Sequence, residues 1–205
     1  MPSCCRPSTL PTAGTLCWST ALIALLSLAP AAQAECADVL PVDLLPSDGS
    51  CAWSRDGAAQ TAYTLEELAE IINGGAFLFY DYGFIAAAFQ NYAGEIGGDP
   101  SALTLGLYNQ GSGANAAALY ADPESGSGEP VPGWEGSGEA RYTAAFGFLT
   151  LQFHEACFFG SLTFTAGGEA ALPHAVCLAQ AVVAAIQQAT PAKPQHWGTI
   201  KAAYR

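Results

Sequence analysis

The stretch that decides the fold is YTAAFGFLTLQF (142–153), followed by HEA (154–156) and CFFGSLTFT (157–165). The two outer segments are rich in Phe, Leu and Thr and alternate in polarity with the period of two that is typical of strands. We therefore predict an antiparallel hairpin that turns at 154–156. Residues 169–188 follow and are almost wholly apolar, which predicts a long helix buried over most of its surface.

Residues 64–80 carry apolar side chains at helical spacing, and Thr64 with Glu67 matches a capping box. We predict one helix over 64–80, ended by Tyr82-Gly83. Asn73-Gly74-Gly75 interrupts this pattern and alone would predict a turn. We favour a continuous helix because the apolar stripe resumes in phase afterwards, and because glycines allow a close approach to a sheet.

The remaining segments complete an order of helices and hairpins. We predict strands at 84–92 and 103–108, a short helix at 113–121 and a loop or disordered insertion at 124–138. The entry segment 35–63 is irregular and ends in an extended piece at 60–63. This order predicts an α+β fold: a single domain with a mainly antiparallel sheet of about four to five strands and helices packed on one face.

Composition limits the chain to one domain and excludes several partners. The 205 residues are 51% apolar and 12% charged, which suits a single core. We assign the domain to 35–189 and a loose tail to 190–205. Eighteen acidic against six basic residues give a net charge of −12, so nucleic acid and anionic membrane surfaces are unfavourable partners.

The N-terminal residues 1–34 have the three parts of a secretory signal. Arg6 precedes an apolar run at 21–29, and Ala32-Gln33-Ala34 forms a small-x-small cleavage site. We predict export to the periplasm or the medium, with a mature chain that begins at Glu35 and has no stable membrane span. An uncleaved anchor is less favoured because the run is about half of the roughly 20 residues that cross a bilayer.

Removal of residues 1–34 leaves four cysteines: Cys36, Cys51, Cys157 and Cys177. An even number in an oxidising compartment predicts two disulfides, and three pairings are open. We favour Cys36 with Cys51 and Cys157 with Cys177, since each pair closes a short loop.

The helical region also resembles an uncharacterised family of exported bacterial proteins. The likeness rests on 63–68, on Ile71-Ile72-Asn73-Gly74-Gly75-Ala76 and on Tyr80 with Tyr82-Gly83-Phe84, and it continues more weakly over most of the mature domain. Leu65, Phe77 and Asn109 depart from the family pattern, which tends to have proline, glutamate and aspartate at these positions. The family has no established activity, so the resemblance implies export and no particular chemistry.

Catalytic and metal-binding patterns are weak. His154 with Cys157 and His174 with Cys177 together have the composition of a zinc ligand set. Residues three apart on a strand point to opposite faces, so His154 and Cys157 should not converge. Export also favours disulfides over free thiolates. His154 and Glu155 are neighbours on a strand and should also face apart. There is no Gly-x-Ser-x-Gly elbow. Acidic groups at 66–70 and 122–139 are read as solvated surface, with loose calcium binding by the second group left open.

The patch that we single out as a candidate ligand site lies at the interrupted helix. Its residues combine an amide, a flexible backbone and aromatic walls: Asn73, Gly74, Gly75, Tyr80, Tyr82 and Phe84. Asn and Gly inside a helix cost stability, and such a conflict has either a packing or a functional cause. We favour packing.

The function that these patterns favour is a non-catalytic binding or accessory module of the cell envelope or periplasm, without a cofactor and with a small-molecule or protein partner. A small metal-dependent or His/carboxylate hydrolase is the alternative, and it requires His154 or His174 in a pocket beside a carboxylate. A structural protein that associates through the loop around Trp134 is a third reading.

Overall fold

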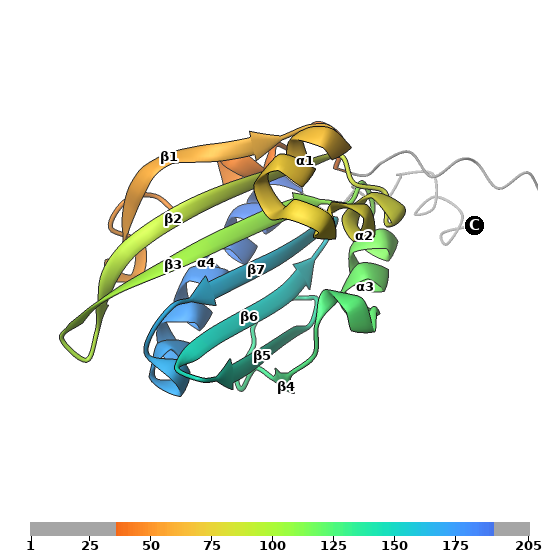
Figure 1. The fold of residues 1–205 in the computed structure, drawn as a ribbon. Helices are drawn as coiled ribbons and strands as arrows, with labels where there is room; N and C mark the ends of the chain where they lie inside the picture. Colours follow the sequence, from red (N-terminus) through yellow and green to blue (C-terminus); the bar gives the residue numbers. More distant parts are fainter. Residues whose placement is uncertain (1–35, 191–205) are drawn as a thin grey trace, which may run out of the picture. The chain divides into compact units, whose positions relative to one another are not determined.

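A computed structural model describes residues 36–190 and contains one antiparallel sheet of seven strands in the order β1-β2-β3-β7-β6-β5-β4 (Figure 1). The strands are β1 (Ser54–Ala62), β2 (Ala86–Ile96), β3 (Asp99–Asn109), β4 (Glu129–Pro130), β5 (Ala140–Ala145), β6 (Phe148–Glu155) and β7 (Phe158–Phe164). The α+β class and the single antiparallel sheet are confirmed. The predicted signal segment and most of the predicted tail lie outside the described residues.

The expected four to five strands is an underestimate, because tight turns split segments that look continuous. Phe146 and Gly147 both have positive φ, 54° and 84°, and turn the predicted strand 142–153 into β5 and β6. A fully exposed Phe gives no turn signal, which is why the break escapes prediction. The entry segment also pairs over nine residues as β1, and Glu129–Pro130 adds the short edge strand β4.

Helix α4 (Leu172–Ala189) covers one face of the sheet and lies behind it in Figure 1. Its buried residues face the sheet and are Ala175, Leu178, Ala179, Val182, Val183 and Ile186. They pack against large strand side chains such as Leu105, Phe153 and Phe164 in the main hydrophobic core. Within 36–190, Gly168–Ala189 is the one helix long and apolar enough to cross a membrane, and here its apolar side chains fill this core.

The prediction that helices pack on one face is wrong, because the opposite face also carries helices at one end. They are α1 (Leu65–Ile72), α2 (Ala76–Asp81) and α3 (Gly113–Ala121). The bounds of α3 match the helix predicted at 113–121. Leu68, Ala76 and Leu119 join Phe89 and Tyr108 of the sheet in a second, smaller core. The 125–128 segment hydrogen-bonds to Arg141, Thr143 and Gln152 on this face. The remainder of the face is uncovered, and we call it the open face.

The predicted single helix 64–80 is two helices joined by a 3₁₀ turn at Asn73–Gly75. The capping box is confirmed, since Glu67 N donates to Thr64 Oγ1 and Thr64 N donates to a Glu67 carboxylate oxygen, both at 3.2 Å. Asn73 then takes φ 57° and ψ −147° and ends α1. A Cβ added to Gly74 or Gly75 would meet nothing within 4 Å. These glycines therefore form a turn and not a close approach to the sheet.

The four cysteines form two disulfides, but the favoured local pairing is wrong. Cys36 joins Cys157, and Cys51 joins Cys177, across sequence separations of 121 and 126. The first bond ties the start of the described chain to the turn before β7, and the second ties the segment before β1 to α4. The fold brings these distant segments together, whereas sequence distance alone favours short loops. Two disulfides are consistent with an extracellular or periplasmic protein.

Candidate functional site

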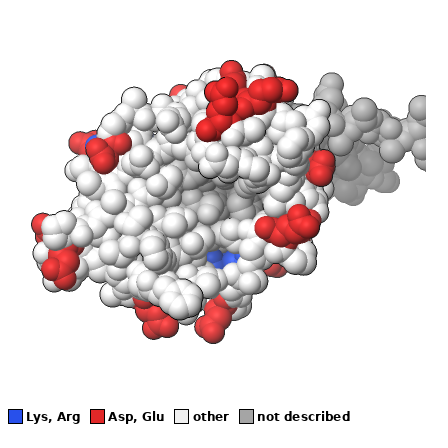
Figure 2. Space-filling model, viewed as in Figure 1, with Lys and Arg blue, Asp and Glu red and all other residues white. Residues whose placement is uncertain are grey.

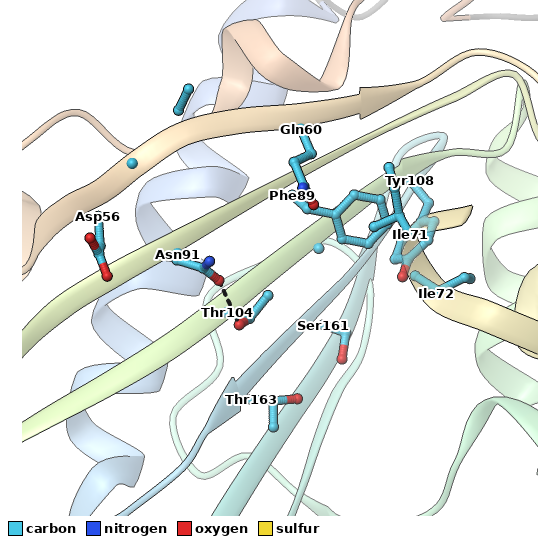
Figure 3. Close-up of a pocket in the computed structure, with 13 residues that line it drawn as sticks. Asp56, Gln60, Ile71, Ile72, Phe89, Asn91, Thr104, Tyr108, Ser161 and Thr163 are labelled. Carbon is cyan, nitrogen blue, oxygen red and sulfur yellow. Dashed lines mark hydrogen bonds between the residues drawn. The ribbon is translucent and has the colours of Figure 1, made fainter. Parts of the chain in front are cut away.

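The open face contains a hollow of about 440 Å³, bounded by β1 on one side and by the end of α1 on another (Figure 3). Its lining residues come from five elements and are Asp56, Gly57, Ala58, Gln60, Ile71, Ile72, Phe89, Asn91, Thr104, Gly106, Tyr108, Ser161 and Thr163. A hollow that combines polar and apolar side chains on the surface of a sheet is a candidate ligand site.

Uncharged hydrogen-bonding side chains form the floor of the hollow. Asn91, Thr104 and Thr163 are register partners on β2, β3 and β7, so their side chains stand side by side on the same face. Thr104 Oγ1 and Asn91 Oδ1 are 2.8 Å apart and form a hydrogen bond (Figure 3). Because a hydroxyl both donates and accepts, this floor can match polar ligand groups of either kind.

Gly106 gives the hollow its depth. Its register partners are Phe89 on β2 and Ser161 on β7. Because glycine has no side chain, nothing projects from β3 above the floor at this position. A Cβ at this position would lie 3.2 Å from ring atoms of Phe89 and of Tyr108. The glycine therefore also lets these two rings approach each other, edge to face at 5.4 Å.

One end of the hollow is apolar. Ile71 and Ile72 from the last turn of α1 face Phe89 and Tyr108 of the sheet (Figure 3). The Tyr108 ring stacks on Phe79 with centroids 4.0 Å apart, and burial raises the pKa of its hydroxyl. Tyr108 is therefore a fixed, neutral wall, and the site has an apolar end beside a polar floor.

A bulge in β1 forms the rim opposite α1. The register to β2 passes from Asp56↔Asn91 to Gln60↔Phe89, so β1 has extra residues here, including Gly57 with φ 76°. The buried Gln90 reaches this bulge from the other face of the sheet. Its Nε2 donates to the carbonyl oxygens of Gly57 at 3.2 Å, Asn91 at 2.8 Å and, more weakly, Asp56 at 3.4 Å.

Asp56 is the one charged side chain among the lining residues. Figure 2 shows acidic side chains around the border of the open face and a hollowed centre without acidic side chains, with a basic patch beside the hollow. Arg141 also rises from the strands of this face, but its guanidinium is occupied by Gln152, the Tyr120 carbonyl and Ser125 at 2.8–2.9 Å. The hollow therefore disfavours anionic ligands and accepts neutral ones.

The residues singled out from the sequence lie beside this hollow and not in it. Asn73, Gly74 and Gly75 are exposed in the turn that follows Ile72, and Tyr80 is 56% exposed on α2. Tyr82 Oη donates to Asp122 at 2.6 Å, which raises the pKa of Tyr82 and lowers that of Asp122. Phe84 packs on the smaller core. The turn helps to place Ile71 and Ile72 over the sheet.

His154 and Glu155 face apart, as their spacing on a strand predicts. His154 Nε2 accepts from the Glu139 N–H at 3.2 Å, its ring packs on Tyr120, and burial lowers its pKa. His174 Nδ1 accepts from Trp53 Nε1 at 3.3 Å. Both histidines thus accept protein hydrogen bonds, and neither lines the hollow.

Glu155 holds the loop that precedes β5. The carboxylate is buried and accepts from Ser137 N at 2.7 Å, Ser137 Oγ at 2.5 Å, Gly138 N at 3.0 Å and Gln187 Nε2 at 3.2 Å. Burial raises the pKa of Glu155, but these hydrogen bonds outweigh it and leave the pKa below its ordinary value. Trp134 is half-buried against Phe153 and belongs to this anchored loop, so 124–138 is not a disordered insertion.

The cysteines of the two His-x-x-Cys pairs are in different disulfides, so neither supplies a thiolate for zinc. Among the described residues no cluster of three or more His, Cys, Asp or Glu side chains could hold a metal ion.

Sequence reasoning missed the floor of the hollow, although the chain contains a signal for it. Leu-Thr-Leu occurs at 103–105 and again at 149–151, and Leu-Thr-Phe occurs at 162–164. Each places one Thr between two large apolar residues, and the period of two sends that Thr to the face opposite the core. Only the strand order shows that these threonines become neighbours.

No protein-family model, curated protein or solved structure matches this chain. The likeness to an exported bacterial family therefore stays a prediction from the motif residues.

Proposed function

We propose that the chain is an exported, non-catalytic binding module that holds an uncharged ligand in the hollow of the open face. The observation that carries this proposal is the lining itself: hydroxyl and amide groups form the floor, apolar side chains form one end, and Asp56 is the one ionised group. Such a site can bind and orient a neutral molecule. It offers no nucleophile paired with a base, which a hydrolase requires.

Two further observations support binding over the hydrolase alternative. The ring nitrogens that His154 and His174 present to neighbouring groups accept protein hydrogen bonds. All four cysteines at or beyond position 36 are cross-linked. The proposal places the protein in the periplasm or outside the cell, in line with the motif resemblance. Mass analysis of a chain recovered from the periplasm or the medium should find Glu35 at its N-terminus.

The experiment that tests the binding function is a thermal-shift screen of the oxidised protein, followed by calorimetry. Neutral sugars, polyols and amides are compared with phosphate and citrate, because a ligand that binds only the native state raises Tm. We expect neutral compounds to raise Tm and the anions to leave it unchanged.

A matched pair of variants locates the binding. Thr104 and Ala102 are both exposed on the open face of β3, but Thr104 lines the hollow and Ala102 does not. Thr104→Trp should block binding by filling the hollow, whereas Ala102→Trp should leave binding intact. A neutral ligand that binds equally to both variants would place the site elsewhere and contradict the proposal.

A further inference from the structure

The floor of the hollow is part of a longer line of polar side chains that crosses the sheet at right angles to the strands. The register pairs Asp56↔Asn91, Asn91↔Thr104, Thr104↔Thr163, Thr163↔Thr150 and Thr150↔Thr143 connect six strands. We call these six residues the polar row. Adjacent strands lie about 4.8 Å apart, so the row is about 24 Å long. Its β5 and β6 end extends well beyond the hollow.

The row is accessible, and the line of residues on one side of it is uncharged. Asn91 and Thr104 are exposed, and Thr163 and Thr150 are half-exposed. The next line of open-face residues toward the β2–β3 and β5–β6 turns is also exposed and uncharged: Ala93, Ala102, Thr165, Phe148 and Ala145. Phe148 is 51% exposed and offers an aromatic surface beside Thr150. Figure 2 shows that the acidic side chains of this face lie at its border and not at its centre.

The polar row recognises its ligand through side chains alone. It crosses β2, β3, β7 and β6, which are internal strands whose backbone groups are already paired on both sides. An extended peptide therefore cannot add to the sheet here by backbone hydrogen bonding, because that mode requires an edge strand. Thr163 and Thr150 are half-exposed register partners, and the hydroxyl of each can donate and accept a hydrogen bond.

We propose that the polar row binds a linear, neutral glycan laid across the strands, with the hollow as one of its subsites. This inference rests on the proposed function and names its ligand class. A glycan chain presents hydroxyls at regular intervals, and one sugar unit is about as long as the spacing between strands. The net charge of −12 and the acidic border disfavour glycans that carry carboxylates.

The test is calorimetry of the oxidised full chain with glycans of increasing length. Mono-, di-, tetra- and hexasaccharides of β-linked glucose and of N-acetylglucosamine serve as probes, with polygalacturonate as the acidic comparison and a neutral extended peptide as the alternative polymer. We expect affinity to rise with length until the row is spanned, because each further subsite adds contacts. Polygalacturonate and the peptide should not bind.

Thr150→Val separates this inference from the proposed function, because Thr150 lies on the polar row but does not line the hollow. The variant should weaken hexasaccharide binding roughly three- to tenfold by removing one hydroxyl, and leave monosaccharide binding unchanged. The matched control is Thr61→Val on β1. The register partner of Thr61 is Ala88, which belongs to the core under α4, so the side chain of Thr61 faces away from the open face. It should change neither affinity.

Three results would overturn the inference. Hexasaccharides that bind no better than monosaccharides, with no effect of Thr150→Val, would restrict recognition to the hollow and leave the proposed function standing. Tight binding of the peptide in place of the glycans would assign the row to a different polymer. Loss of all neutral ligands, with Tm unchanged by every probe, would remove the proposed function as well.

Discussion

The two faces of the sheet are made by the same strands and yet have opposite compositions. On β3, Leu103, Leu105 and Leu107 point to the core under α4, while Thr104 and Gly106 point to the open face. Large apolar side chains buried on one face supply most of the folding free energy. The residues of the other face are therefore not needed for the core and can supply hydroxyl groups and form a hollow. Because side chains alternate between the two faces, residues that stabilise the fold and residues that could bind a ligand alternate along each strand.

Both disulfides belong to the covered side of this comparison. Cys36 and Cys157 are members of the core under α4, and Cys51 packs against it. They tie the entry segment to β7 and to α4, across loops of more than a hundred residues. Long loops gain the most from cross-linking, because the unfolded chain loses the most freedom.

The largest expected effect comes from removal of the Cys36–Cys157 bond. The variant with Cys36→Ala and Cys157→Ala keeps the Cys51–Cys177 bond, so it opens a loop of about 35 residues. It should lose about 4 kcal/mol of unfolding free energy in the loop-entropy model, which is a large share of the stability of a typical domain. Urea denaturation of the oxidised wild type and the variant measures the difference. A loss below about 1 kcal/mol would mean that the core holds the entry segment without the bond.

Two neighbours on β7 test the comparison directly. Phe164 is fully buried on the covered face beside Trp53, and Thr163 lies on the open face. Phe164→Ala should cost about 3–5 kcal/mol by leaving a cavity, whereas Thr163→Ala should change stability by less than about 0.5 kcal/mol. Urea denaturation checks both. Equal costs would show that the open face also contributes to the core and is not free for ligands.

Glu155 gives a pH test of the covered side. Its pKa is below the ordinary 4.5, so the unfolded chain binds the proton first as pH falls. The stability from this carboxylate is therefore complete above about pH 4.5 and is lost as pH falls from there through the folded-state pKa. Glu155→Gln should cost roughly 1–3 kcal/mol at neutral pH, since an amide cannot accept all four hydrogen bonds. Denaturation curves across pH 2 to 7 measure both effects.

The contradictory outcome for Glu155 is a variant that keeps the wild-type slope of stability below pH 4.5. Another carboxylate would then account for that slope. Loss of stability that begins near pH 6.5 does not bear on this test, because burial lowers the pKa of His154 in the fold and the unfolded chain therefore begins to protonate this histidine first.

The sequence predicts the fold class well because the strongest local patterns agree with tertiary packing. The capping box at Thr64, the helix at 113–121 and the apolar helix after 168 are all found within a few residues of their predicted bounds. The predictions fail where local signals conflict with the fold. The turn at Phe146-Gly147 places a Phe at positive φ, and Asn73 breaks a helix whose apolar stripe continues in phase.

The candidate site is predictable only in part, because it depends on strand order. Alternation identifies Thr104, Thr150 and Thr163 as residues that face away from a core. No local sequence pattern indicates that β3 pairs with β7. This pairing brings Thr104 and Thr163 together from positions far apart in the chain. The pairing of the disulfides escapes prediction for the same reason, since each bond joins segments that only the folded sheet makes adjacent.

The smallest effect concerns the link between the two faces. Gln90 is buried on the covered side, yet its amide supports the β1 bulge that borders the hollow. Gln90→Met keeps the side-chain length and removes the donor, so it should cost about 1 kcal/mol while loosening the bulge and weakening ligand binding. Amide hydrogen exchange at 57–59 measures the loosening, with Gln188→Met, exposed on α4 and outside the hollow, as control. Unchanged exchange would mean that β2 pairing alone shapes this rim, and that the faces act independently.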